Sequence, residues 1–282
     1  MNRPLPSDVA ERIVGLARSG QPQEALLAPL LEQGWEEADA IDAVDHALRE
    51  FLDRHARDSG LPPSVPVPAP VGLNGPSVIR AVDRDVQVVM SLLLPRVVVL
   101  GGLLSHEECD ELVAMSRQRL QRSQILNPET GADEVHVDRT SEGTHFERGA
   151  NPLCARIEAR IAALLEWPVE KGEAIQILRY GPGAQYRPHH DYFDPQWPGS
   201  VGHLRRGGQR VASLVMYLNT PAQGGATVFP ESNLEIGAVK GNAVFFSYDR
   251  PHPMTRTLHA GAPVVEGEKW IATKWLRERR HD

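Results

Sequence analysis

Two histidines and one aspartate have the residue types and the spacing of a metal site. His189 and Asp191 stand two positions apart, so on a β-strand both side chains would project from the same face. His259 follows after several more segments with a strand pattern, which would let the chain return beside the first strand. Two imidazoles and one carboxylate, with open positions opposite them, are the ligand set of mononuclear non-haem iron(II) oxygenases. This set predicts the oxidation of a substrate with dioxygen.

Other interpretations of the histidines remain open. A His-x-Asp segment alone also occurs on ordinary surfaces, and zinc ligands could have the same spacing. His190 would point to the opposite face of the strand and is the weaker candidate. His203 and His252 compete with His259, but the glycine, arginine and proline residues beside them are typical of surface loops. His259 is therefore the predicted third ligand.

A lysine follows the second histidine of this set. Strand alternation places Lys269, Ile271 and Thr273 on one face and Trp270 on the other. A lysine on an apolar, inward face needs an anionic partner, because an isolated buried charge is costly. The alternative is a surface lysine at the start of a strand. If it points inward, Lys269 predicts a site for an anionic cosubstrate.

The segments that must position these residues change character along the chain. After Glu173, short runs rich in β-formers are separated by glycine and proline turns, at residues 174–180, 211–218, 226–229, 243–247 and 270–275. Before them, residues 96–104 indicate a strand, and Ser105-x-x-Glu108 is a capping box for a helix through residue 121. Residues 152–166 have helical periodicity, whereas 123–150 indicate a long loop or a loosely held hairpin. We expect an α+β fold, with a jelly-roll (double-stranded β-helix) core braced by helices.

The first part of the chain has a different pattern. Residues 7–57 show three short amphipathic helices, and residues 59–76 are rich in proline. We predict a small helical bundle over residues 1–58, a linker over 59–76 and a catalytic domain over 77–282. The bundle suits docking to a protein partner or self-association; it could equally pack on the main domain.

Composition narrows the class of protein. The chain has 282 residues, 41% hydrophobic and 24% charged, which is typical of a soluble globular protein. Its net charge of −7 argues against a nucleic-acid partner. The two cysteines, Cys109 and Cys154, form no C-x-x-C pair, so a disulfide framework or structural zinc is not expected. The apolar runs are too short to span a membrane, and the first residues lack a signal-peptide pattern, so we expect a cytoplasmic protein.

Five ordered motifs and one loop resemble the prolyl 4-hydroxylase family of 2-oxoglutarate and iron(II)-dependent dioxygenases. The first motif is the metal strand, from Tyr180-Gly-Pro-Gly through Tyr186-Arg-Pro-His189-His-Asp191. The others are Gly208-Gln-Arg210 leading to Met216-Tyr-Leu-Asn219, Gly224-Gly-Ala-Thr227-Val-Phe-Pro230, Leu258-His259-Ala-Gly-Ala-Pro, and Lys269-Trp270 to Lys274-Trp275. Upstream, Arg139-Thr-Ser141-Glu-Gly143 resembles the family's loop over the active site. The likeness covers roughly residues 95 to 280.

The resemblance implies a role for each matching residue. His189, Asp191 and His259 would hold Fe(II), and Lys269 would bind the distal carboxylate of 2-oxoglutarate, with Tyr180 and Thr227 as further donors in that pocket. The positions on the substrate side are Tyr186, Arg210, Trp275, Arg139 and Ser141. The implied reaction converts 2-oxoglutarate and O2 to succinate and CO2 and hydroxylates a C–H bond, with L-ascorbate as reductant.

The resemblance also implies a substrate class, a prolyl residue of a peptide or protein. The same chemistry on a free amino acid or small metabolite is the first alternative. A second is a non-catalytic binding module whose helical bundle does the work. A third is a zinc hydrolase, which would leave Lys269 without a task.

Overall fold

The computed structural model describes residues 5–70 and 75–281 and divides into two compact units, Met1–Ser64 and Val65–Asp282. The division falls inside the segment predicted to be a linker, whose residues 71–74 lie outside the described part. The Val65 backbone N–H donates to the Asp249 carbonyl at 2.7 Å, and the Val65 and Val67 side chains pack on the core of the second unit. These residues of the proline-rich segment therefore belong to the catalytic unit.

The N-terminal unit is made of three helices, as predicted: α1 (Ser7–Arg18), α2 (Gln23–Leu31) and α3 (Glu37–Asp58). Their apolar stripes meet in a small core. The core residues are Val9, Ile13, Leu26, Leu27, Leu30, Ala40 and Val44.

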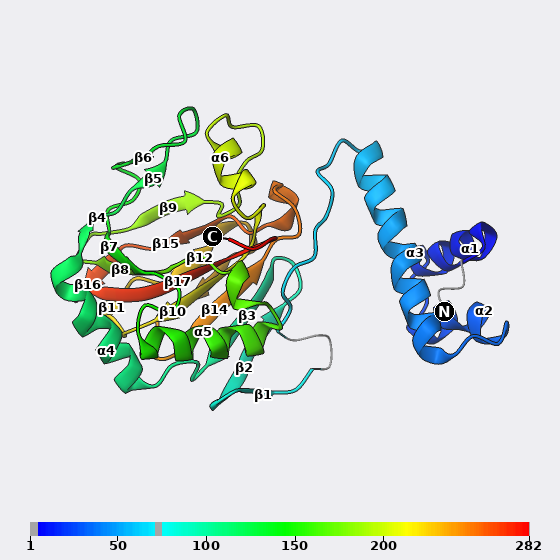
Figure 1. Cartoon of the computed structure of the whole chain (residues 1–282), viewed down its shortest axis with the longest axis horizontal. Helices are drawn as coiled ribbons and strands as arrows, with labels where there is room; N and C mark the ends of the chain where they lie inside the picture. Colours follow the sequence, from blue (N-terminus) through cyan, green and yellow to red (C-terminus); the bar gives the residue numbers. More distant parts are fainter. Residues whose placement is uncertain (1–4, 71–74, 282) are drawn as a thin grey trace. The chain divides into compact units, whose positions relative to one another are not determined.

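The second unit is built on a nine-stranded antiparallel sheet (Figure 1). Its strands, in spatial order, are β1 (Val78–Ala81), β2 (Arg84–Leu92), β3 (Arg96–Gly101), β14 (Ala243–Ser247), β10 (Arg210–Tyr217), β17 (Lys269–Arg277), β8 (Ile175–Tyr180), β7 (Glu142–Phe146) and β4 (Gln121–Arg122). A second sheet has the order β13 (Leu234–Ile236), β12 (Thr227–Phe229), β15 (His259–Gly261) and β9 (Tyr186–His189). Two short ladders pair β11 (Gln223–Gly224) with β16 (Val264–Glu266) and β5 (Ile125–Leu126) with β6 (Asp133–Glu134).

The large sheet has two buried faces. One face packs against helices α4 (His106–Ser116) and α5 (Pro152–Leu165), which lie along it in Figure 1. The other face contributes Leu178, Tyr217 and Ile271 to a second apolar core, which includes Phe229 and Ile236 of the small sheet. Two facing sheets braced by helices are the predicted jelly-roll architecture. Strand alternation therefore decides which side chains enter the space between the sheets.

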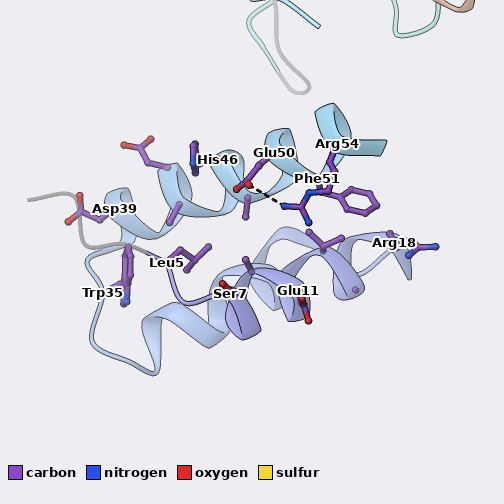
Figure 2. Close-up of a pocket in the computed structure, with 16 residues that line it drawn as sticks. Leu5, Ser7, Glu11, Arg18, Trp35, Asp39, His46, Glu50, Phe51 and Arg54 are labelled. Atoms are coloured by element: carbon purple, nitrogen blue, oxygen red, sulfur yellow. Dashed lines mark hydrogen bonds and ion pairs between the residues drawn. The ribbon is translucent and has the colours of Figure 1, made fainter. Parts of the chain in front are cut away.

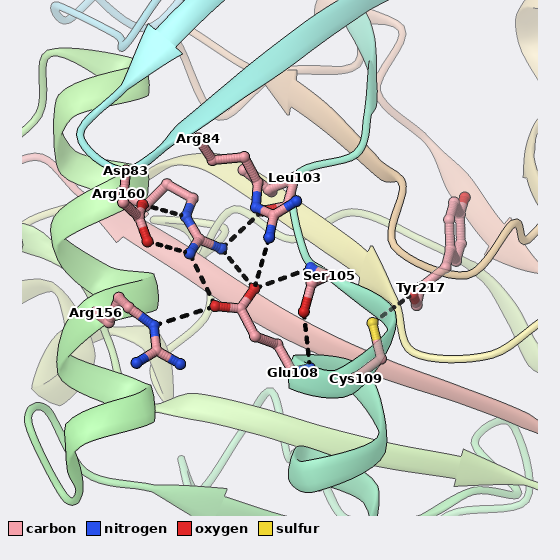
Figure 3. Close-up of polar contacts among 9 residues, drawn as sticks. All are labelled: Asp83, Arg84, Leu103, Ser105, Glu108, Cys109, Arg156, Arg160 and Tyr217. Carbon is pink, nitrogen blue, oxygen red and sulfur yellow. Dashed lines mark hydrogen bonds and ion pairs between the residues drawn. The ribbon is translucent and has the colours of Figure 1, made fainter.

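A buried ion cluster joins the helices to the sheet (Figure 3). Ser105 and Glu108 form the predicted capping box of α4. The Glu108 carboxylate also accepts two hydrogen bonds from Arg160 of α5, at 2.8 and 2.9 Å. Arg160 in turn donates to Asp83, in the turn between β1 and β2, at 2.7 and 2.9 Å. The Glu108 carboxylate thus caps α4 and connects it to α5 through Arg160. Arg160 then connects both helices to the β1–β2 edge of the sheet through Asp83.

Several elements differ from those expected. Residues 78–92 form the hairpin β1–β2, which was not predicted. The segment 123–150, predicted as a long loop or a loosely held hairpin, contains the short hairpin β5–β6 and also the strand β7. β7 pairs in register with β8, from Glu142 opposite Arg179 to Phe146 opposite Ile175. The helix expected through residue 121 ends at Ser116, followed by a 3-10 turn, Arg117–Arg119. His203 lies in the short helix α6 (Ser200–Arg205) rather than in a loop.

Two further observations concern the class of protein. Cys109 and Cys154 are both buried and are free thiols. Among the residues that the structure describes, no helix is both long enough and apolar enough to cross a bilayer.

Candidate active site

The register of the small sheet brings the three predicted metal ligands together. β9 and β15 are antiparallel neighbours in which His189 and His259 are directly opposite partners. Asp191 follows β9 by two residues. The distances from His189 Nε2 to Asp191 Oδ1 and from His259 Nε2 to Asp191 Oδ2 are both 3.5 Å. One ligand atom from each residue lies within 4.8 Å of the other two.

Backbone carbonyls orient both imidazole rings. His189 Nδ1 lies 2.8 Å from the carbonyl oxygen of Arg187, and His259 Nδ1 lies 3.0 Å from that of Thr257. A proton on each Nδ1 would satisfy these contacts and leave Nε2 as an unprotonated donor facing Asp191. Burial, together with nearby His189, lowers the pKa of His259 to about 4. His259 is therefore neutral near pH 7, as a metal ligand must be.

Asp191 is held in its ionised form and in one orientation. Burial alone would raise its pKa, but His259 and His189 outweigh that effect and keep the pKa below its ordinary value. Ser213 Oγ of β10 donates to Asp191 Oδ2 at 2.6 Å, and the Tyr248 hydroxyl lies 3.0 Å from Ser213 Oγ. Two imidazole nitrogens and one oriented carboxylate, all convergent, fit the three-residue face that iron(II) oxygenases offer their metal.

Lys269 lies in the same cavity as the three ligands. It starts β17 opposite Tyr180 of β8, and it is 2% exposed. Burial lowers the pKa of Lys269 to about 8. Among the described residues, no carboxylate lies within ion-pair distance of its ammonium group; its nearest ring contacts are Tyr180 and Tyr217, at 5.6 and 5.8 Å. A buried cation in this position requires an anion from outside the protein.

Hydroxyl groups accompany this lysine. The Tyr217 hydroxyl donates to Thr227 Oγ1 at 2.8 Å, both groups being buried. Tyr180 is also buried, and burial raises its pKa, so its hydroxyl stays protonated as a donor. The predicted pocket residues Tyr180 and Thr227 therefore do lie beside Lys269.

The residues predicted on the substrate side divide into two groups. Tyr186, Arg139 and Trp275 line the cavity with the ligands. The Tyr186 ring stacks on His189 with a centroid distance of 3.5 Å, and the Arg139 guanidinium lies 5.0 Å from the Tyr186 centroid. Arg210 and Ser141 do not line the cavity. Arg210 lies behind Trp275, 4.0 Å from its ring, with its guanidinium bound to Glu173 at 2.7 and 2.8 Å, and Ser141 Oγ bonds Ser123.

The sequence did not reveal every residue of the site. Ser213, Tyr248 and Tyr217 stand in apolar strands or beside them, where they resemble packing residues. The alternation of β10 does place Ser213, Val215 and Tyr217 on one face, and this was the available signal. Only the tertiary structure shows that the Ser213 hydroxyl bonds Asp191 and that the Tyr217 hydroxyl bonds Thr227.

Comparison with known proteins identifies this architecture. Residues 175–277 match the family described as the 2OG-Fe(II) oxygenase superfamily. Prolyl 4-hydroxylase 1 of Arabidopsis thaliana is 41% identical over 204 residues, which cover 66% of this chain and 70% of that protein. Prolyl 4-hydroxylase 2 of the same plant is 35% identical over 207 residues, covering 64% and 67%. The solved 2-oxoglutarate complex of the viral collagen prolyl hydroxylase of Paramecium Bursaria Chlorella virus-1 is 31% identical, with a TM-score of 0.49, over 64% of this chain and 95% of that one.

The chain is therefore an iron(II)- and 2-oxoglutarate-dependent oxygenase. Within that class it belongs to the prolyl 4-hydroxylase family. Its metal is Fe(II), and 2-oxoglutarate and O2 are its cosubstrates.

Proposed function

We propose that this chain hydroxylates prolyl residues within a peptide or protein. The observation that carries the proposal is one cavity in which the three ligand residues lie with a buried lysine that has no counter-ion among the described residues. The substrate class is supported by relatives named prolyl 4-hydroxylases at 32–41% identity.

In this proposal each residue of the cavity has a definite task. His189, Asp191 and His259 hold iron(II), which supplies the oxidative chemistry that turns 2-oxoglutarate and O2 into succinate and CO2 while a C–H bond is hydroxylated. Lys269 binds the distal carboxylate of 2-oxoglutarate through a charge-assisted hydrogen bond. Thr227 and Tyr180 supply hydroxyl contacts to the same molecule. These contacts fix where the cosubstrate lies relative to the three ligands.

The aromatic side of the cavity holds the substrate. Trp275 presents a flat apolar surface suited to a proline ring, whereas the Tyr186 ring stacks on His189 and is contacted by Arg139. Arg210 supports the site from behind: its guanidinium is bound by Glu173, lies over the Trp275 ring and donates to the backbone carbonyl of Asp191 at 3.4 Å. Ser141 contacts the Tyr180 side chain through a hydrogen bond and helps to position it. Together these groups exclude water from the carbon that is hydroxylated.

The test is succinate formation from 2-oxoglutarate under air with added Fe(II). Wild type is compared with His189→Ala, and each is given a proline-rich peptide, free proline or neither. The proposal expects turnover that rises with the peptide, does not rise with free proline and is lost in the variant. Stimulation by free proline alone would assign the site to a small metabolite. An inactive wild type that still binds stoichiometric iron would indicate a binding module.

Two further expectations belong to the same proposal. L-ascorbate would sustain turnover by keeping the iron reduced, so its omission should shorten the productive lifetime of the enzyme without changing the initial rate.

A cytoplasmic location is supported by the two free thiols, which suit a reducing compartment. Fractionation of the producing cells would test the location.

A further inference from the structure

A groove between α1 and α3 forms a second concave surface, confined to the N-terminal unit (Figure 2). Its floor contains the half-buried side chains of Val14, Trp35 and Phe51, whereas the charged residues on its rims are exposed. Ala43 and Ala47 line its α3 wall one helical turn apart. Small side chains in this position would let another helix approach α3 closely.

Charge along the groove has a direction. Asp39 and Asp42 belong to the first turns of α3, and Asp39 lies at the end of the groove that contains Leu5 and Trp35. Arg54 lies at the opposite end, together with Arg18 of α1, whose guanidinium is 5.8 Å from the Phe51 centroid. Arg54 pairs with Glu50 at 3.1 Å; among the described residues, no ion pair involves Asp39, Asp42 or Arg18. Among the described residues, the acidic charges at one end therefore have no ion pair, whereas at the basic end Arg54 already shares Glu50 and Arg18 has no ion pair.

A two-fold axis across the groove would satisfy both ends at once. In a two-fold interface the same surface is used by both copies, and it must be complementary to itself. If α3 of a second copy lies antiparallel to the first, with the axis between His46 and Ala47, Asp39 of each copy comes opposite Arg54 of the other. Ala43 and Ala47 then lie near the axis, where the two helices need to approach most closely.

The length of α3 suits this arrangement. It has 22 residues, or about 33 Å at 1.5 Å per residue, so it extends along the full groove. A groove with acid at one end and base at the other selects the antiparallel orientation of an identical helix and disfavours the parallel one, in which like charges would meet. A uniformly charged partner would satisfy only one end.

We propose that the α1–α3 groove is a self-association surface, in which α3 of a second copy of this chain lies antiparallel to α3 of the first. The inference does not depend on the catalytic proposal. The test measures the mass of the full chain in solution by sedimentation equilibrium. We expect twice the 31.1 kDa chain mass for the wild type.

Two charge reversals make the test specific. Asp39→Arg and Arg54→Asp each place like charges opposite one another at both ends of the interface, so each alone should weaken the dimer about tenfold or more. An equimolar mixture of the two variants should associate again, because each chain then offers the charge that the other lacks. Asp45→Arg and Arg49→Asp are matched controls on α3 outside the groove; they should leave the mass unchanged.

Circular dichroism of each variant verifies that the helices remain folded, which is expected because both reversed positions are exposed. A wild type that stays monomeric at about 100 µM, a concentration well above the dissociation constant of a specific dimer, would overturn the proposal. So would a dimer that survives both reversals, since it would use another surface. A monomeric wild type that binds a peptide substrate in an Asp39-dependent manner would assign the groove to substrate instead.

Discussion

At the scale of single residues, Lys269 is a buried cation of the cavity that has no carboxylate within ion-pair distance among the described residues. Replacing Lys269 with Met should raise the KM for 2-oxoglutarate roughly 10- to 100-fold, the size expected for a lost hydrogen bond between charged groups. It should not destabilise the protein, because a buried unpaired charge is removed. Initial rates and thermal unfolding measure the two effects. Lys240→Met, at a lysine paired with Asp110 outside the cavity, should change neither.

The same lysine predicts a pH dependence. Burial lowers the pKa of Lys269 to about 8, below its ordinary 10.5. The protonated form binds the cosubstrate carboxylate and is the dominant form below pH 8. The affinity for 2-oxoglutarate should therefore fall as the pH rises from 8 toward 10, a trend that Lys269→Met should lack. Equal slopes for both proteins would argue against this role.

A second residue-scale prediction concerns the orientation of the carboxylate ligand. Ser213 donates to Asp191 Oδ2 and so orients the carboxylate that would hold the metal. Ser213→Ala should weaken metal binding about 10- to 100-fold, the usual effect of losing a hydrogen bond to a ligand residue. Titration of the metal-free chain with Mn(II) measures this affinity without turnover. Ser116→Ala, at a buried serine of α4 that bonds the Leu112 carbonyl, is the matched control, and an equal loss there would contradict the assignment.

At the scale of elements, Glu108 connects α4 to α5 and so supports the large sheet from behind. Burial alone would raise the pKa of the Glu108 carboxyl above its ordinary 4.5. Hydrogen bonds from Arg160 and from the Ser105 backbone outweigh burial and lower the pKa to about 2. The stabilisation is therefore complete above pH 4.5 and is lost as the pH falls through 2. Glu108→Gln should cost about 3 kcal/mol of unfolding free energy near pH 7, because it leaves a buried arginine without its full partner.

Urea unfolding at several pH values tests this account. The stability difference between wild type and Glu108→Gln should shrink steadily between pH 4.5 and 2. Glu107→Gln, on the exposed side of the same helix, should unfold much like the wild type. A difference that is independent of pH would show that Glu108 contributes through packing rather than through its charge.

Elements with a local sequence signal could be predicted, whereas elements that depend on contacts distant in sequence could not. Alternate side chains of a strand share a face, so Lys269 was expected beside Ile271, and the structure places both in the lining of the cavity. The capping box at Ser105 is a local signal that set the start of α4. β7 was missed because its polar sequence, Glu142 to Phe146, shows no strand pattern of its own, and its pairing with β8 supplies the missing stability. Arg210 was predicted on the substrate side, but the structure places it outside the cavity lining and binds it to Glu173, a contact distant in sequence.

At the scale of the whole molecule, the chain is two units with separate cores. A chain beginning at Pro62 keeps the backbone bond of Val65 and every residue of the cavity. It should retain metal binding and 2-oxoglutarate turnover, because the apolar cores of the second unit consist of its own residues. The expected loss is self-association. Succinate assays and sedimentation of the shortened chain check both points, and an unfolded product would show that the units depend on each other.

The claim that unites these scales is that the cavity hydroxylates a prolyl residue of a peptide. The most direct measurement is mass spectrometry of a proline-rich peptide after incubation with the full chain, Fe(II), 2-oxoglutarate and isotopically labelled O2. The account predicts one labelled oxygen atom on carbon 4 of a proline, matched by one succinate, and none with His189→Ala. Succinate formation by the wild type with the peptide unchanged would contradict it.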